Sequence, residues 1–283
     1  MPTACLPGWG SLTFPRCIAV SCRLAPPPPR NRKPPTPVSD DWTHAFFDAL
    51  ALSLWQQAIP DEQTADEAEF LQHALSLRAD MPVLDVPCGD GRLAVAMAEL
   101  GCRVTGVDAS PAFLDAARAR AAQRKMDVTW LAADMRHLPR HQFDAACCMG
   151  NSFGYLDAAG TQVFLDAVGQ ALRPGGRFLL DTAMAAESIL PELSERAWQA
   201  AGDMLVLSEY TYHVETSRLE TDYTFIQGTR RETRQATYSV FTLGEINRML
   251  ARAGLTARDW LADTDETPYY VGAHRLLLVA EKA

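Results

Sequence analysis

Short apolar runs alternate with stretches of helical spacing along the middle of the chain. Runs of consecutive apolar residues predict buried strands, and apolar residues at every third or fourth position predict amphipathic helices. The predicted strands are 82–86, 103–107, 128–132, 143–149 and 177–180, and the predicted helices between them are 92–100, 111–124 and 161–172. Several strands are apolar on both faces, so the pattern predicts an α/β fold in which helices cover both sides of a parallel sheet.

Two more helices are predicted before this alternation begins. The first runs from Asp40 to Ala58, and its aromatic side chains either pack in the core or form a lid: Trp42, Phe46, Phe47 and Trp55. The second runs from Thr64 to Leu77, in which Thr64 and Glu67 have the spacing of a capping box.

The pattern changes after residue 184. Three β-prone runs, 204–214, 218–227 and 231–240, follow one another without helices between them, so residues 185–240 are predicted to form a small antiparallel sheet inserted after the fifth strand. A helix over 243–253 and a hairpin of strands over 255–261 and 275–279 complete the predicted fold.

Composition separates residues 1–37 from residues 38–283. The first segment holds ten of the 18 prolines and five basic residues but no acidic residue. Proline removes backbone donors and blocks helices, so we expect a disordered, extended tail before a single globular domain. A signal or transit peptide and an extension from a wrongly assigned start are the alternatives.

Charge and cysteine content narrow the classes of function. The net charge of −9 argues against a nucleic-acid-binding surface, and no run of about 18 apolar residues predicts a membrane helix. The seven cysteines have neither metal-ligand spacing nor an even number, so we expect buried thiols in a cytoplasmic protein and no metal site.

Candidate chemistry lies where the first three predicted strands end. Asp85 closes the first strand and is followed by a turn with Gly89 and Gly91, which lets the backbone approach a ligand. Asp108 closes the second strand, where a carboxylate can hold two ribose hydroxyls, and Asp134 follows the third, where it can accept the amino hydrogens of adenine.

The glycine spacing alone also fits a nicotinamide dinucleotide. A dinucleotide places a pyrophosphate at this turn, and Asp85 and Asp90 would repel it. Two carboxylates instead favour a ligand with a positive end, such as the ammonium of a methionine moiety.

These motifs together resemble the class I S-adenosylmethionine-dependent methyltransferases, over about residues 40–283. The resemblance rests on the Asp85–Gly91 string, Asp108, Asp134-Met135 and the Leu172–Gly176 turn. It implies a Rossmann-like seven-stranded sheet with an antiparallel last strand and S-adenosylmethionine as the cofactor. The implied cofactor-binding residues are Asp85, Cys88, Gly89, Gly91, Asp108, Ala109, Asp134, Met135 and Met149.

The acceptor side is predicted from the residues after the fourth strand and from the insertion. Asn151, Ser152, Phe153 and Tyr155 are the candidate substrate-binding residues. No catalytic base is identified; His213, Tyr155 and Tyr270 are the candidates. The insertion, with Tyr210, Tyr212 and Tyr223, is expected to act as a lid and substrate wall.

The expected activity is transfer of a methyl group from S-adenosylmethionine to a small-molecule or peptide acceptor, with nitrogen favoured over oxygen. The tetrapeptide of DNA amino-methyltransferases is missing after the fourth strand, which argues against a nucleic-acid base as substrate. Two alternatives stay open: a non-catalytic S-adenosylmethionine-binding regulatory module and a nicotinamide-dependent oxidoreductase.

Overall fold

The computed structural model describes residues 46, 52, 56, 58–140 and 143–283. The predicted tail over 1–37 and most of the predicted helix over 40–58 lie outside the described residues. The four described positions of that helix, 46, 52, 56 and 58, are helical.

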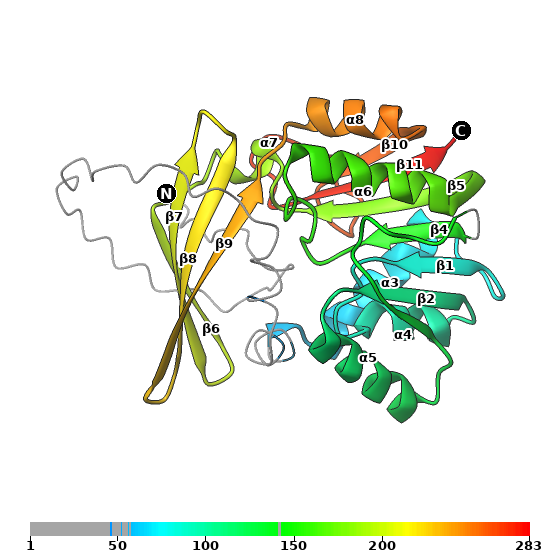
Figure 1. Cartoon of the computed structure of the whole chain (residues 1–283), viewed down its shortest axis with the longest axis horizontal. Helices are drawn as coiled ribbons and strands as arrows, with labels where there is room; N and C mark the ends of the chain where they lie inside the picture. The colour runs from blue at the N-terminus through cyan, green and yellow to red at the C-terminus, as the bar shows by residue number, and fades with distance from the viewer. Residues whose placement is uncertain (1–45, 47–51, 53–55, 57, 141–142) are drawn as a thin grey trace.

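A seven-stranded sheet, on the right in Figure 1, forms the larger part of the molecule together with the helices that cover it. Its strand order is β10-β11-β5-β4-β1-β2-β3; β1 pairs in parallel with β2 and β4, whereas β11 pairs antiparallel with both β5 and β10. The prediction of a Rossmann-like sheet with an antiparallel last strand is therefore confirmed. The bounds are β1 Pro82–Asp85, β2 Arg103–Asp108, β3 Thr129–Ala132, β4 Phe143–Cys148, β5 Leu172–Thr182, β10 Leu255–Leu261 and β11 Leu276–Lys282.

Helices cover both faces of this sheet because its central strands are apolar on both sides. Helices α6 (Ala158–Ala171) and α8 (Leu243–Arg252) enclose one core, in which Phe164 contacts the sheet at Phe178. Helices α3 (Asp61–Ala74) and α4 (Arg92–Glu99) enclose the other core. Helix α5 (Pro111–Arg124) packs beside α4, β2 and β3.

The predicted capping box of the second helix is absent. Helix α3 begins at Asp61 rather than Thr64, and its N-cap Pro60 makes no side-chain cap hydrogen bond. Glu67 instead lies buried and forms a 2.6 Å ion pair with Arg92, a charge-assisted contact. A reciprocal capping box does occur in α8, between Thr242 and Glu245.

The turn predicted at Pro174-Gly175-Gly176 lies inside β5. Pairing with β4 passes from Phe143↔Leu172 directly to Ala145↔Arg177, so the intervening residues of β5 form a bulge. Gly175 in this bulge has a φ of +76°, which glycine adopts readily.

The insertion forms a second, antiparallel sheet of four strands, in the order β6-β7-β8-β9 (Figure 1). Its bounds are β6 Arg196–Ala201, β7 Met204–His213, β8 Arg218–Gln227 and β9 Arg230–Ser239, and the short helix α7 (Ala186–Ile189) precedes it. Strand β6 was not predicted, because three of its six residues are alanines, which have low β propensity. The end of β9 reaches the core, where the Ser239 N–H donates to the Gly154 carbonyl at 2.7 Å.

Candidate functional site

The loop between β1 and α4 is shaped by a glycine that no other residue replaces without strain. Gly91 is the N-cap of α4 and has left-handed backbone angles, φ 76° and ψ 13°. A Cβ at this position would lie 2.7 Å from the Trp130 ring and 2.8 Å from the Ala117 Cβ atom. The close approach of Trp130, which sequence analysis did not single out, therefore fixes the path of this loop.

Asp108 joins the end of β2 to the glycine loop. Its Oδ2 atom accepts the Gly89 N–H at 2.9 Å and its Oδ1 atom accepts the Ser110 N–H at 2.8 Å. Burial raises the pKa of Asp108, and these backbone donors act in the opposite direction. A carboxylate has about four lone-pair sites, so two N–H donors leave acceptor capacity for hydroxyls of a ligand. Ala109, beside it, is exposed.

Asp85 places a carboxylate at the end of β1 with one oxygen unsatisfied. The side chain is 2% exposed; its Oδ1 atom accepts the Cys147 thiol at 3.5 Å, while Oδ2 has no hydrogen-bond partner among the described residues. Burial raises the pKa of Asp85 to about 7, against the lowering effects of the Cys147 thiol and the Arg92 charge. A cationic ligand group would compensate this buried carboxylate.

Two of the predicted cofactor-binding residues, Cys88 and Met149, are buried in this structure. The Cys88 N–H donates to the Val107 carbonyl at 2.9 Å, which holds the glycine loop against β2. Burial raises the pKa of the Cys88 thiol, so it is no thiolate nucleophile at neutral pH. Met149, at the end of β4, is 4% exposed and belongs to the core beneath α3 and α4.

The charge argument made for Asp90 is corrected by its partner. The Arg120 guanidinium forms an ion pair with the Asp90 carboxylate, and Arg120 Nε donates to the Asp90 carbonyl at 3.2 Å. The negative charge of Asp90 is therefore compensated within the chain, so the charge argument for a positive ligand rests on Asp85 alone. The two partners are 30 residues apart, a pairing that only the tertiary structure reveals.

Asp134 is held by its neighbour Arg136. The Arg136 backbone N–H and Nε both donate to Oδ1, at 2.7 and 2.9 Å, and Nη2 donates to Oδ2 at 2.7 Å. Partial burial raises the pKa of Asp134, but the hydrogen bonds and charge of Arg136 outweigh it and hold the pKa below its ordinary value. Met135 is half-buried against the core that α6 and α8 enclose. A role of Asp134 in adenine binding therefore requires that it share its oxygens with Arg136.

The segment after β4 connects to the end of β5. Asn151 has a φ of +62°, and its Oδ1 atom accepts the Ala183 N–H at 2.8 Å. Ser152 is buried, and its hydroxyl donates to the Met149 carbonyl at 3.5 Å. Phe153 is 2% exposed and packs against Phe241 in the core. The four predicted substrate-binding residues therefore have different surroundings. Asn151 and Ser152 are hydrogen-bonded within the loop after β4, Phe153 packs in the core, and Tyr155 contacts the insertion.

Tyr155 joins an aromatic cluster formed by the inner face of the insertion. Its ring lies 5.7 Å from that of Tyr238, whose hydroxyl is 3.3 Å from the Tyr223 hydroxyl. Phe46 also packs on Tyr223, with ring centroids 5.5 Å apart, so this residue of the predicted first helix contacts the insertion. Burial raises the pKa of Tyr155, which keeps its phenol protonated. Sequence analysis missed Tyr238; the period-two pattern of β9 places it on the same face.

The other two catalytic candidates lie elsewhere. His213 is at the end of β7, with Nδ1 3.9 Å from a Glu215 oxygen and Nε2 3.8 Å from a Glu220 oxygen. Strand alternation places it on the face opposite Tyr212. Tyr270 is 57% exposed in the segment between β10 and β11. None of the contacts described for these two residues involves the strand-end carboxylates.

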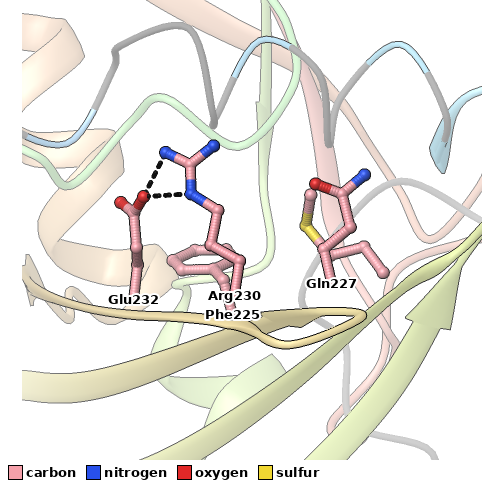
Figure 2. A pocket seen from close by; sticks show the side chains of 5 residues that line it. Phe225, Gln227, Arg230 and Glu232 are labelled. Atoms are coloured by element: carbon pink, nitrogen blue, oxygen red, sulfur yellow. Dashed lines mark hydrogen bonds and ion pairs between the residues drawn. The ribbon is translucent and has the colours of Figure 1, made fainter.

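A small pocket opens at the far end of the insertion. It is lined by Met204, Phe225, Gln227, Arg230 and Glu232. Figure 2 shows the Arg230 guanidinium turned toward the Glu232 carboxylate. The two charged groups that line this pocket therefore pair with each other. The register places the pocket residues at the opposite end of the sheet from Tyr238, which argues against this pocket as the methyl-transfer site.

Two other kinds of feature are absent from the described residues. No group of three or more His, Cys, Asp or Glu side chains within the described part of the chain is arranged to hold a metal ion. Among the same residues, no helix has the length and apolar character needed to cross a membrane.

Comparisons with known proteins agree with this geometry. Residues 83–176 match the family model described as a methyltransferase domain. Glycine N-methyltransferase of Rattus norvegicus is 33% identical over 153 residues, and ubiquinone biosynthesis O-methyltransferase of Xanthomonas oryzae is 30% identical over 142 residues. Each alignment covers 48% of this chain, and the chain spans about half the length of these curated relatives, 52% and 58%.

Solved structures extend the similarity to nearly the whole fold. The CcbJ methyltransferase from Streptomyces caelestis is 19% identical with a TM-score of 0.70, covering 82% of this chain and 96% of that one. A SAM-bound amino pentose methyltransferase from Micromonospora echinaspora is 22% identical with a TM-score of 0.64, covering 84% and 98%. The chain therefore has the fold of the class I S-adenosylmethionine-dependent methyltransferases, with a methyltransferase-domain match over residues 83–176.

Proposed function

We propose that this protein transfers a methyl group from S-adenosylmethionine to a small-molecule or peptide acceptor, and that the accepting atom is a nitrogen. The observation that carries the proposal is the arrangement at adjacent strand ends: the glycine loop after β1, the Asp108 carboxylate bonded to that loop, and the unsatisfied Asp85 oxygen beside it. A donor with a ribose diol and a cationic methionine end matches these groups in charge and hydrogen bonding.

Each group has a role in donor binding under this proposal. Asp108 accepts the ribose hydroxyls with the lone pairs that Gly89 and Ser110 leave free. Asp85 faces the cationic methionine end and is stabilised in its charged form by it. Asp134 and Met135 border the adenine, and the Gly91 turn lets the backbone approach the donor.

The reaction itself demands little acid–base chemistry. The sulfonium is already activated, so in-line attack by a neutral amine needs alignment and exclusion of water. The protonated phenols of Tyr155, Tyr223 and Tyr238 offer an aromatic, hydrogen-bonding wall rather than a base. Such a wall suits a polar amine and also favours a cationic methyl donor.

Similar proteins support nitrogen as the accepting atom. One is named glycine N-methyltransferase, and the solved structures include a sugar N-methyltransferase from Streptoalloteichus and a glycopeptide N-methyltransferase. An O-methyltransferase is also among the relatives, so oxygen acceptors belong in the test.

The test combines binding with transfer. Calorimetric titration should show binding of S-adenosylmethionine and its demethylated product, with no binding of NAD. Incubation with methyl-labelled donor and a panel of amino sugars, amino acids, short peptides and catechols should then label an amine. Labelling of catechols alone would move the proposal to oxygen, and donor binding without labelling of any component of a cell extract would favour a regulatory module. Binding of NAD but not of S-adenosylmethionine would overturn the proposed methyltransferase function.

A further inference from the structure

A network of alternating charges, buried except at Asp263 and in part at Arg92, connects elements around the central strands. Arg92 Nη2 is 2.6 Å from Glu67 Oε2, and Arg275 Nη1 is 3.5 Å from Glu67 Oε1. Arg275 Nη1 also lies 3.9 Å from Asp181 Oδ2, and its Nη2 lies 2.6 Å from Asp263 Oδ1. Helix α3, helix α4, strand β5 and the β10–β11 hairpin therefore meet in one ionic network.

Three of these side chains are almost fully buried, so the charge of each must be compensated by its neighbours in the network. The side chains of Glu67, Arg275 and Asp181 are 2%, 6% and 6% exposed. Burial raises the pKa of Glu67, but Arg92, Gln63 and Arg275 outweigh it and hold the pKa below its ordinary value, so Glu67 is charged. Removing one member of such a group leaves an uncompensated buried charge, which is strongly unfavourable.

Two ends of the network, Arg92 and Asp181, lie at the loops after β1 and β4, which flank the proposed donor site. Arg92 directly follows Gly91, the turning point of the loop after β1. Asp181 Oδ2 accepts the Gly150 N–H at 3.0 Å, in the loop after β4. Because β1 and β4 are paired in parallel, both loops leave the same edge of the sheet.

Both loops contain backbone that needs support. Gly91, Gly150 and Asn151 all have positive φ angles. Conformations of this kind persist where surrounding contacts hold them, and binding sites require such preorganisation to a fraction of an ångström.

We propose that Glu67 and Arg275 are positioning residues for the methyl donor: through Arg92 on one side and Asp181 on the other, they hold the loops after β1 and β4 in the relative arrangement that binds it. This inference rests on the proposed function, because it takes S-adenosylmethionine as the ligand of those loops. Neither residue touches the ligand; each acts through its buried neighbours.

The central experiment compares Glu67→Gln with Glu69→Gln, an exposed glutamate on the same helix. The Glu67 variant keeps the side-chain shape and removes the charge, and we expect its dissociation constant for S-adenosylmethionine to rise about tenfold or more at a temperature where it is fully folded. The acceptor KM should change much less than the donor KM. The Glu69 variant should bind the donor as the unaltered protein does.

A double variant tests whether the two residues act together. Because Arg275→Gln removes the charge that Glu67 compensates, the Glu67→Gln/Arg275→Gln protein should lose less donor affinity than the product of the single losses. Glu67→Asp, which keeps the charge, should recover part of the affinity, and it replaces Glu67→Gln in the comparison if that variant does not fold.

The outcomes separate this inference from the proposed function. If the Glu67 variants melt earlier but bind the donor with unchanged affinity when folded, the network is structural only and the inference is wrong. If the unaltered protein does not bind S-adenosylmethionine at all, the proposed function fails instead.

Discussion

Asp85 and Asp108 end neighbouring strands but have different surroundings. Asp108 is oriented by two backbone N–H groups, whereas Asp85 has one thiol donor and one unsatisfied oxygen. A carboxylate that accepts backbone donors is held in place for a hydrogen-bonding ligand. A buried carboxylate with an unsatisfied oxygen remains responsive to the charge of whatever binds next to it.

Replacing Asp108 with alanine should weaken donor binding with the fold retained. Charge-assisted hydrogen bonds contribute about 1.5–3 kcal/mol, which corresponds to a roughly tenfold to hundredfold increase in the dissociation constant. Calorimetric titration of Asp108→Ala with S-adenosylmethionine measures this dissociation constant. Asp115→Ala is the control, because Asp115 is an exposed carboxylate in the next helix along the chain. Unchanged affinity in Asp108→Ala would remove Asp108 from the donor site.

Asp85 should make both stability and donor affinity depend on pH. Its pKa is raised from an ordinary 3.8 to about 7 in the folded protein, so its protonated form favours folding. The stability that this proton confers is present below about pH 4 and is lost as pH rises toward 7. Asp85→Asn cannot ionise at this position, so its free energy of unfolding should not fall for this reason. As pH rises from about 4 to about 7, chemical denaturation should therefore show the variant becoming more stable relative to the unaltered protein.

Donor affinity should follow the opposite course. A cationic donor needs the ionised form of Asp85, so the affinity of the unaltered protein should rise as pH passes through about 7. Asp85→Asn should bind weakly, with little dependence on pH over this interval. Equal pH profiles for the two proteins would show that Asp85 does not face the donor.

At the scale of elements, the insertion presents one face to the core. Tyr210 and Tyr212 on β7 and Tyr223 on β8 fall on the same face, because the register pairs Tyr210 with Thr221 and Tyr212 with Leu219. Alternation within one strand does not relate its faces to those of the next strand, and the register between β7 and β8 supplies that relation. The shared face packs on Tyr155 and Phe46, from two other parts of the chain.

Removing single hydroxyls from this face should alter acceptor kinetics alone. Tyr223→Phe and Tyr238→Phe each take away one partner of the hydroxyl pair and leave the rings packed. We expect a several-fold higher acceptor KM or lower kcat, with donor affinity within about twofold of the unaltered protein. Thr224→Val, on the outer face of the same strand, is the control. A change in donor affinity instead would show that the insertion is not the acceptor wall.

At the scale of the whole molecule, the sheet could be predicted because its central strands are apolar on both faces. Because the sheet is parallel at β1, β2 and β3, its prediction also placed Asp85, Asp108 and Asp134 at the same edge of the sheet. The partners of charged residues could not be predicted: Arg275 and Glu67 are 208 residues apart, and Arg120 and Asp90 are 30 apart. Periodicity reports which face of an element is apolar, and only the packed elements show which charges meet.

Residues 1–37 should be dispensable for the domain. Their sequence has no spaced apolar positions with which to pack on it. A chain that begins at Val38 should therefore keep its melting temperature within about 2 °C and its donor affinity unchanged, since about 1 kcal/mol shifts the melting temperature of a domain of this size by a few degrees. Differential scanning calorimetry of the two chains provides the comparison, and a drop of several degrees would show that the segment packs.

The insertion leaves and re-enters the core at neighbouring points. Ala185 and Phe241 form a bridge, and the Ala186 N–H donates to the Phe241 carbonyl at 2.8 Å. The backbone therefore leaves the core and returns to it at adjacent residues, and the four-stranded sheet lies between these two points. A sheet from another protein could be inserted there without changing the path of the core backbone. The site residues up to Met149 all precede the insertion in the chain. Substitutions in the insertion can accordingly accumulate in one contiguous stretch of gene without altering the strand-end residues Asp85, Asp108 and Asp134.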